Sequence, residues 1–385
     1  MQDLEENRNR ENGKGIRGGN MVMEQNRKLI LENGQEYCGY GFGAETERIC
    51  ELVFNTSMVG YQEILSDLSY ADQTVVMTYP LIGNYGMAEE DYESKVPAIG
   101  ALAVRDYRDV PSNFRSTATL SEVMKRYQIP GISGIDTRKL TRVIRDEGSC
   151  QALITGISTS KEQGLALLKG YSRPHDAVSR VSCKEKYVLP GTEEKYHVAA
   201  IDCGMKQRIL AGLTQRGCRV TVVPYDTPPE EIAALGPDGI FLSNGPGDPE
   251  DVPETIQTVK ALRGRYPIFG ICLGFQMIAL AYGAKTYKLK FGHHGGNHPV
   301  RDLATGKIEI TSQNHSYAVK ADSLAATPLR ATHVNLLDQT LEGVCCEEDR
   351  VFGVQYHPES APGPQDSGYL FDRFMKLMEE GKNNG

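Results

Sequence analysis

Apolar and polar residues are arranged in short blocks over the first part of the chain. Strand-like and helical patterns are interspersed there, at residues 51–55, 74–78, 100–104, 120–127 and 137–147. Ahead of them, Asn33 and Gly34 separate two short apolar runs, which is the strongest short-range signal for a β-hairpin. We therefore expect a mixed α/β domain over residues 26–175.

A second pattern begins after residues 176–195, a charged stretch without periodicity that we interpret as a linker. Strands without a polar face follow at residues 198–201, 220–223, 239–242 and 268–271. Each of them is followed by a helical or loop segment, which is typical of a parallel sheet covered on both faces. Such a doubly wound sheet binds ligands at the carboxyl ends of its strands. We expect this domain to span residues 196–382.

Composition narrows the class of protein. A chain of 385 residues exceeds what one hydrophobic core usually supports, which agrees with two domains. The net charge of −8 argues against nucleic acid or an acidic membrane surface as a partner, because both require a basic field. No apolar stretch resembles a membrane-spanning helix. Residues 1–25 are polar and lack the features of a signal or transit peptide, so we expect a disordered tail.

Cysteine usage indicates the compartment. The nine cysteines are scattered and form no C-x-x-C pair, which favours a reduced, cytoplasmic environment. Cys345 and Cys346 are too close in sequence for an easy disulfide. We expect them on one strand, with one side chain on each face.

The segment around Cys272 has the form of a nucleophile elbow. An apolar strand runs directly into a helical pattern, with Gly270 and Gly274 two residues before and after the cysteine. Glycines permit the tight turn that projects the side chain from the sheet. The helix directs its amino-terminal dipole at the sulfur, so we expect a thiol that is substantially ionised at neutral pH. The alternative is a small buried cysteine that fills a strand–helix junction.

Tyr356-His357-Pro358-Glu359 supplies a candidate base for this nucleophile. Proline disfavours helical backbone in the residue before it, so we expect an extended segment with His357 and Glu359 on one face. Glu359 then orients the imidazole, which accepts the thiol proton and later protonates the leaving amine. Taken alone, His-Pro-Glu is also compatible with an ordinary surface turn.

The loop of residues 243–249, with the sequence SNGPGDP, follows the third apolar strand at its carboxyl end. Gly245 and Gly247 let the backbone approach a substrate closely. Together with the amide of Leu273, their amides are candidates to stabilise the oxyanion that forms when Cys272 attacks a carbonyl. Because Gly, Pro, Asn and Asp dominate ordinary turns, a turn that caps the next helix is the alternative.

These three segments, in their order along the chain, resemble the class I, or triad-type, glutamine amidotransferases. The first domain is similar to the small chains of carbamoyl phosphate synthetases in residues 53–63 (VFNTSMVGYQE) and 135–141 (IDTRKLT). Residues 291–299 (FGHHGGNHP) also look like those small chains. The resemblance covers residues 26–378. It implies an amino-terminal mixed α/β domain followed by a class I amidotransferase domain with a mostly parallel, doubly wound α/β sheet.

The resemblance also implies roles for individual residues. Cys272 would form a γ-glutamyl thioester, His357 would shuttle protons, and Glu359 would orient His357. The family's glutamine contacts carry over to Ser57, Gly245, Gly247, Leu273, Gln276, Asn314, Ser316 and Tyr317. The first domain would mediate assembly and supply Ser57. Two departures stand out, since the usual Asn-His-Gly-Phe reads Asn-His-Ser-Tyr at residues 314–317, and Phe275 stands where the family usually has His.

A large-chain partner follows from the same resemblance. The chain contains no G-x-x-x-x-G-K-[ST] loop for phosphate, so ATP and a divalent metal are expected on the large subunit and no cofactor on this chain. Ammonia released from glutamine would reach that subunit through an internal passage. The carbamoyl phosphate made there would feed pyrimidine and arginine synthesis.

Three imidazoles within six residues, those of His293, His294 and His298, raise the question of a metal site. Structural zinc sites usually add cysteine ligands at fixed spacing, and these are absent here. We therefore expect no metal, and a glycine-rich loop near the active site or the subunit interface.

Three alternatives differ in the partner or in the chemistry. One is an amidotransferase that serves another synthetase, such as those for anthranilate or guanylate, although those relatives lack residues 55–63. A catalytically silent regulatory scaffold has no chemical reason to keep a nucleophile, a base and an orienting carboxylate together. A free-standing cysteine hydrolase would be active without a synthetase chain.

Overall fold

The computed structural model describes residues 16–17, 20–21, 24–360 and 362–383. The disordered tail predicted for residues 1–25 lies almost entirely outside the described residues. Of that tail the structure describes β1 (Ile16–Arg17) and β2 (Asn20–Met21), which pair antiparallel. Within the described ranges, the helices lack the length and apolar character that crossing a bilayer requires.

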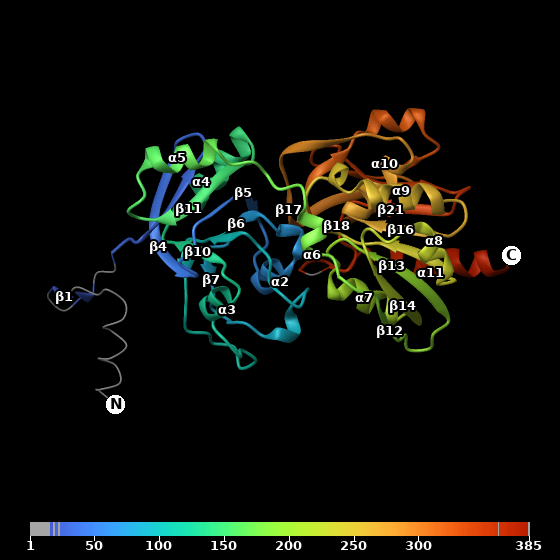
Figure 1. The fold of residues 1–385 in the computed structure, drawn as a ribbon, viewed down its shortest axis with the longest axis horizontal. Helices are drawn as coiled ribbons and strands as arrows, with labels where there is room; N and C mark the ends of the chain where they lie inside the picture. The colour runs from blue at the N-terminus through green and yellow to red at the C-terminus, as the bar shows by residue number, and fades with distance from the viewer. Residues whose placement is uncertain (1–15, 18–19, 22–23, 361, 384–385) are drawn as a thin grey trace.

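The amino-terminal half contains a closed barrel, seen at the left of Figure 1. Around the barrel the strands follow the order β10 (Pro130–Ser133), β4 (Glu36–Gly43), β3 (Arg27–Leu31), β11 (Cys150–Gly156), β5 (Arg48–Asn55), β6 (Gln73–Met77) and β8 (Ala101–Ala103). The predicted hairpin joins β3 and β4, and Gly34 adopts the positive φ of 84° that its turn requires. Mixed α/β composition is confirmed, whereas barrel closure was not predicted.

Helices and short elements pack around the barrel. They are α2 (Tyr61–Ser66), η1 (Leu68–Tyr70), η2 (Glu89–Asp91), α3 (Leu120–Arg126), α4 (Thr137–Glu147), α5 (Lys161–Lys169) and the strand pair β7 (Leu81–Ile82) and β9 (Asp106–Tyr107). The helix α4 shows why the local sequence folds as it does. Its amide at Lys139 donates to the carboxylate of Asp136 at 2.9 Å, and Leu140 and Ile144 bury one face.

The carboxy-terminal half is built on one ten-stranded sheet. Its strands, in spatial order, are β12 (Tyr187–Leu189), β14 (Cys218–Pro224), β13 (Tyr196–Asp202), β15 (Gly239–Leu242), β16 (Ile268–Ile271), β21 (Val351–Val354), β20 (Leu341–Cys346), β19 (Arg330–Asn335), β17 (Thr286–Asp302) and β18 (Ile308–Val319). From β14 to β21 the strands pair in parallel, as the apolar runs predict. The remaining strands join antiparallel, and β17 with β18 forms a long ribbon.

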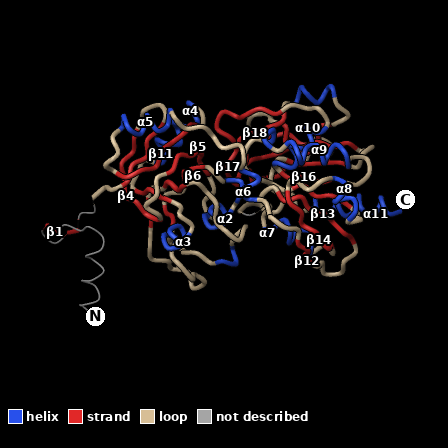
Figure 2. The backbone as a smooth tube through the Cα atoms, viewed as in Figure 1, coloured by secondary structure: helices blue, strands red, loops and turns tan. Residues whose placement is uncertain are grey.

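Helices cover both faces of this sheet, as Figure 2 shows by the blue segments around the red strands. The elements outside the sheet are α6 (Ala177–Val181), α7 (Gln207–Thr214), α8 (Pro229–Ala234), η3 (Pro249–Asp251), α9 (Pro253–Leu262), α10 (Leu273–Ala281), η4 (Ala321–Ala326) and α11 (Tyr369–Asn383). One core forms between the sheet and α8, α9 and α10, and the other between the sheet, α7 and α11. Cys346 lies in the first core and Cys345 in the second, which confirms their predicted opposite orientation.

The segment that the sequence marks as a linker, residues 176–195, is more structured than expected. It contains α6 and β12, and β12 extends the sheet by pairing antiparallel with β14. This edge strand has only three residues, two of them exposed, and the charged residues around it hid its pairing. The stretch therefore belongs in part to the second half of the molecule.

The ribbon strand β17 forms the seam between the two halves, and its label lies between them in Figure 1. Phe291 on β17 stacks on Phe54 of the barrel strand β5, with ring centroids 5.8 Å apart. The amide of Thr56 donates to the carbonyl of His294 at 3.3 Å, and that of Ser149 donates to the carbonyl of Lys290 at 2.8 Å. Barrel and sheet are thus joined by apolar packing and by backbone hydrogen bonds.

Candidate active site

Cys272 lies at the turn between β16 and α10, with φ 55° and ψ −104°. Non-glycine residues rarely adopt this conformation, and it often occurs at functional sites. Gly270 and Gly274 serve close packing, because a Cβ on Gly270 would lie 2.6 Å from the backbone of Gly274, and one on Gly274 would lie 2.4 Å from the carbonyl of Leu242. Cys272 itself, and neither Gly270 nor Gly274, adopts the positive φ of the elbow.

Burial works against the thiolate that the sequence predicts. Cys272 is 2% exposed, and burial, reinforced by the carboxylate of Asp67, raises the pKa of its thiol despite the opposing charge of Lys206. Loss of solvation outweighs the helix dipole, so the expected ionisation at neutral pH is wrong for the chain without substrate. The neutral thiol donates to the carbonyl of Asn314 at 3.5 Å. Its activation therefore requires a base.

His357 and Glu359 are the predicted base and its predicted orienting partner. The Nδ1 atom of His357 lies 2.6 Å from Oε1 of Glu359, and both side chains are completely buried. The extended backbone predicted here is wrong, because the amide of Ser360 donates to the carbonyl of His357 at 3.2 Å and closes a turn. This turn brings the two side chains together. The Nε2 atom of His357 is buried and has no hydrogen-bond partner among the described residues.

Glu359 is held as a carboxylate. Burial opposes its ionisation, but attraction to His357 and Lys206 lowers the pKa of Glu359 to about 2. An ionised Glu359 is placed to accept a proton from Nδ1 of His357, and in a singly protonated ring this leaves a lone pair on Nε2. A histidine in this tautomer is able to accept a proton from a thiol.

Two charged residues of the site escaped the sequence interpretation. The ammonium of Lys206 lies 3.2 Å from Asp67 and 3.3 Å from Glu359, and it is 2% exposed. Although burial acts in the opposite direction, these carboxylates and that of Glu93 raise the pKa of Lys206, so its charge is fixed. Lys206, Asp67, His357 and Glu359 are called the lysine cluster below.

The lysine cluster draws on both halves of the molecule. Asp67 precedes η1 on the barrel, and it accepts hydrogen bonds from the amide of Ser69 at 2.9 Å and from Asn314 Nδ2 at 2.8 Å. Lys206 follows β13, at the carboxyl end of a parallel strand, where ligand-binding residues are expected. That rule points to the loop of Lys206, whereas no local pattern marks Asp67.

A pocket opens at the carboxyl edge of the parallel strands, between the sheet and the barrel. Among the predicted site residues it is lined by Gly245, Gly247, Cys272, Gln276, Asn314, Ser316 and Tyr317. Barrel residues Glu51, Asp72 and Gln73 form the facing wall. His357 and Glu359 lie outside this lining, buried after β21, which pairs with the strand that precedes Cys272.

Comparison with known proteins places the chain among its relatives. Residues 199–377 match the model of the glutamine amidotransferase class-I family, and residues 29–154 match that of the carbamoyl-phosphate synthase small chain, CPSase domain. The chain is 53% identical over 357 residues to the carbamoyl phosphate synthase pyrimidine-specific small chain of Halalkalibacterium halodurans, covering 93% of this chain and 98% of that protein. The chain belongs to the carbamoyl phosphate synthase small-chain family.

Other family members match at similar levels. Identity is 50% over 359 residues with the carbamoyl phosphate synthase small chain of Listeria monocytogenes, covering 93% of this chain and 98% of that one. It is 51% over 354 residues with the small chain of Fusobacterium nucleatum, covering 92% and 98%. The family assignment therefore holds over the barrel and the sheet together.

Ser316 and Tyr317, which differ from the residues usual in the family, both accept hydrogen bonds in the structure. The hydroxyl of Ser316 accepts a hydrogen bond from Gln73 Nε2 at 3.2 Å, which ties this segment of β18 to the barrel. The carbonyl of Tyr317 accepts from Gln276 Nε2 at 2.7 Å. Because the second contact uses the backbone, the change from Phe to Tyr preserves it.

Two of the residues predicted to contact glutamine do not line the pocket. Leu273 stands behind the wall, with its side chain against Gly245. Ser57 is half-buried on the seam near Gly296, and its amide donates to Asn55 Oδ1 at 2.7 Å. The structure therefore brings most of the predicted glutamine contacts together, but it does not place Ser57 in this pocket.

Proposed function

We propose that the chain is the glutamine-hydrolysing small subunit of a carbamoyl phosphate synthase. The observation that carries the proposal is the His357–Glu359 pair, whose Nε2 is buried and unpartnered at the sheet edge that also holds Cys272. Family membership supports the same reaction. Cys272 serves as the nucleophile, His357 as the base and Glu359 as the residue that orients it.

The reaction begins with transfer of the Cys272 thiol proton to Nε2 of His357. The sulfur then attacks the side-chain carbonyl carbon of glutamine, and the amides of Gly245 and Leu273 stabilise the oxyanion. The carbon–nitrogen bond breaks while His357 returns the proton to the leaving amine, which releases ammonia and leaves a γ-glutamyl thioester. Water, activated by the same imidazole, hydrolyses the thioester to glutamate.

The walls of the pocket suit the substrate. Gly247 lines the pocket and has φ 88°, a conformation that favours glycine. No side chain therefore covers its backbone there. Gln276, Asn314, Ser316 and Tyr317 form the sheet-side wall and would hold glutamine, with Ser57 reaching in from the seam when substrate is bound. Lys206 keeps Glu359 ionised through the cycle, and thereby keeps the His357 tautomer that accepts the proton.

The proposed partner is the large subunit of the synthase. Ammonia would pass to it and be incorporated into carbamoyl phosphate, with ATP and a divalent metal bound on that subunit. Such a complex would operate in the cytoplasm, where the cysteines of this chain stay reduced, and would supply pyrimidine and arginine synthesis.

The decisive experiment uses Cys272→Ala in complex with the large subunit, given ATP and bicarbonate. Carbamoyl phosphate is measured with either glutamine or free ammonium as the nitrogen source. Because alanine removes only the sulfur, synthesis from glutamine should vanish while synthesis from ammonium survives.

Cys203→Ala is the matched control, since Cys203 is also buried and directly follows β13, a parallel strand of the same sheet. It should keep both activities. Survival of glutamine-dependent synthesis in Cys272→Ala would exclude Cys272 as the nucleophile. A wild-type chain that neither binds the large subunit nor supplies it with nitrogen would overturn the assignment to this synthase.

A further inference from the structure

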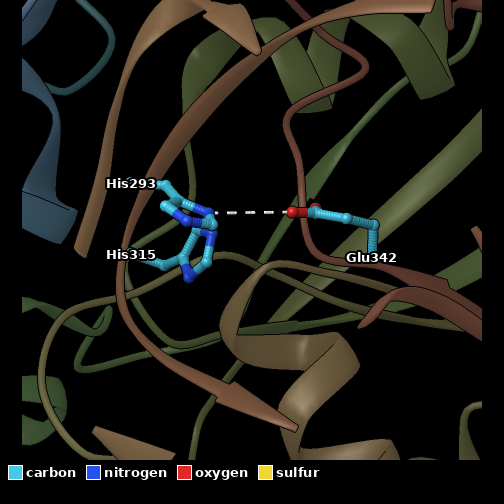
Figure 3. Close-up of side chains that lie close together, drawn as sticks. All are labelled: His293, His315 and Glu342. Carbon is cyan, nitrogen blue, oxygen red and sulfur yellow. Dashed lines mark ion pairs between the residues drawn. The ribbon is translucent and has the colours of Figure 1, made fainter. Parts of the chain in front are cut away.

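A second group of ionisable side chains lies inside the sheet half, away from Cys272. One ring nitrogen of His293, one of His315 and a carboxylate oxygen of Glu342 lie within 4.8 Å of one another. The three residues come from β17, β18 and β20, and Figure 3 shows both imidazoles and the carboxylate directed toward one point. These residues are called the histidine cluster. Sequence spacing did not reveal it, because its three residues lie on three different strands.

On the side that faces away from the cluster, each imidazole ring forms a hydrogen bond of the kind seen in metal-binding histidines. His293 directs Nε2 at the carboxylate of Asp338 at 2.8 Å, and His315 directs Nδ1 at the carbonyl of Tyr317 at 2.7 Å. Histidines that bind metals almost always donate their second ring N–H to a carboxylate or a backbone carbonyl, which fixes the tautomer. When each ring carries a single proton, this arrangement leaves the other nitrogen with a lone pair that faces the cluster.

Glu342 is positioned in the same way. It is 0% exposed, and its two oxygens accept hydrogen bonds from Asn335 Nδ2 and Gln313 Nε2, each at 3.0 Å. Among the described residues no lysine or arginine pairs with it, so the carboxylate is buried without a permanent cation. A buried charge of this kind requires a positive partner.

The inward nitrogens lack suitable partners of their own. His293 Nδ1 is buried without a hydrogen bond, at 3.7 Å from Glu342 Oε1, which is too far for a hydrogen bond. His315 Nε2 faces Gln313 Oε1 at 2.9 Å. When His315 donates through Nδ1, these two atoms are both acceptors, and a cation between them would relieve the conflict.

We propose that His293, His315 and Glu342 bind one divalent transition-metal ion, with zinc the best match. Two imidazole nitrogens and one carboxylate oxygen form a ligand set that zinc uses at about 2.0–2.2 Å, and Gln313 Oε1 is placed to complete it. The ion neutralises Glu342 and uses both inward lone pairs. It replaces any proton carried by His293 Nδ1.

A structural role follows from the neighbours of His315. The preceding residue, Asn314, accepts the thiol hydrogen bond of Cys272 and donates to Asp67, and the following residue, Ser316, is bonded to Gln73. An ion that fixes His315 therefore fixes the strand segment that walls the pocket. Its removal should weaken glutamine binding more than ammonium-dependent synthesis in the complex.

The test measures metal directly, in the full-length chain without an affinity tag. The chain is produced with zinc in the medium, dialysed, and assayed for bound zinc by mass spectrometry and by competition with a chromophoric chelator. We expect one zinc per chain. Cobalt(II) introduced in its place should show the absorption bands of a tetrahedral site.

Variants then assign the ligands. His293→Asn and Glu342→Gln should weaken zinc binding by more than about 100-fold, and Asp338→Asn, which removes only the outer hydrogen bond, by about 10- to 100-fold. His175→Asn changes an exposed histidine elsewhere and should leave zinc affinity unchanged. Cys272→Ala should also retain the ion, which separates this site from the catalytic thiol.

Two results would overturn the proposal. The first is a wild-type chain that takes up no stoichiometric zinc or cobalt; the cluster would then be an imidazolium of His293 between two carboxylates. The second is zinc that is lost in Cys272→Ala but retained in Asp338→Asn and His293→Asn. Because Asp338 is partly exposed, its variant decides the matter even where Glu342→Gln does not fold.

Discussion

The lysine cluster and the histidine cluster are both buried polar groups beside β18, yet they satisfy their charges differently. In the first, the ammonium of Lys206 stands between the carboxylates of Asp67 and Glu359. In the second, Glu342 is surrounded by neutral donors, and the available positive charge is a proton on His293 or a bound ion. A buried carboxylate needs a positive partner. In the lysine cluster that partner is a side chain of the protein, and in the histidine cluster it is a proton or a bound ion.

Neighbouring residues of one strand serve the two clusters. Asn314 bonds to Asp67 of the lysine cluster, whereas His315 belongs to the histidine cluster. The proposed reaction uses the cluster whose cation, Lys206, is built into the chain. The cluster without a fixed cation is suited to holding structure.

The largest expected effect separates the roles within the lysine cluster. His357→Asn removes the proton acceptor and should lower glutamine hydrolysis by about 10⁴-fold, whereas Glu359→Gln, which only loosens the orientation of His357, should lower it by about 10²-fold. Initial rates of glutamate release by the complex measure both. His293→Asn should keep a kcat close to wild type, and equal losses in all three variants would remove the distinction between the clusters.

The second effect concerns stability. Lys206→Met leaves Asp67 and Glu359 buried without their cation, and should lower the free energy of unfolding by about 3–5 kcal/mol. Urea denaturation followed by circular dichroism measures the change. Lys376→Met, which breaks the exposed pair with Glu380 on α11, is the control and should cost less than about 1 kcal/mol. Similar costs for the two variants would show that the buried charge is compensated elsewhere.

A third effect appears in acid. Because the pKa of Glu359 is lowered to about 2 in the folded chain, its stabilising contribution is present above its ordinary value of 4.5 and is lost as the pH falls from there toward 2. Over this window the free energy of unfolding should fall by up to about 3 kcal/mol more in the wild type than in Glu359→Gln. Parallel curves for the two proteins would mean that Glu359 is not held as a carboxylate.

The smallest expected effect tests the link between pocket and barrel. Ser316→Gly removes the acceptor of the Gln73 hydrogen bond and restores the common family residue. A hydrogen bond of this kind contributes about 1 kcal/mol, so KM for glutamine should rise by about fivefold with kcat unchanged. Steady-state kinetics with glutamine, compared with ammonium, measure the change. A lowered KM would indicate that the serine obstructs the pocket.

The sequence predicted the parts of this molecule that depend on local pattern. The parallel strands and the elbow at Cys272 follow from apolar runs and glycine spacing, and the helix α4 begins and ends where its periodicity does. Barrel closure was not predicted, because it pairs segments that are far apart in the chain, such as β10 and β4. The ribbon joins the consecutive strands β17 and β18, but their glycine and polar residues hide the strand pattern.

The site divides along the same line. Cys272, His357 and Glu359 carry motif signals, although the turn at Pro358 and the raised pKa of the thiol depend on burial that a sequence does not display. Asp67 and Glu342 acquire their meaning only from residues far away in the chain. A sequence pattern therefore does not show which charged residues become neighbours in the folded chain.

Asp67 on the barrel pairs with Lys206 on the sheet half. The affinity for glutamine is therefore linked to the free energy of contact between the two halves. If closing the barrel onto the sheet tightens glutamine binding by some factor, glutamine must tighten the closure by the same factor, because the two free energies are reciprocal. Glutamine bound in a pocket lined by both halves would then stabilise their contact, and release of glutamate would remove that contribution. Each turnover would therefore loosen and renew the contact that assembles the site.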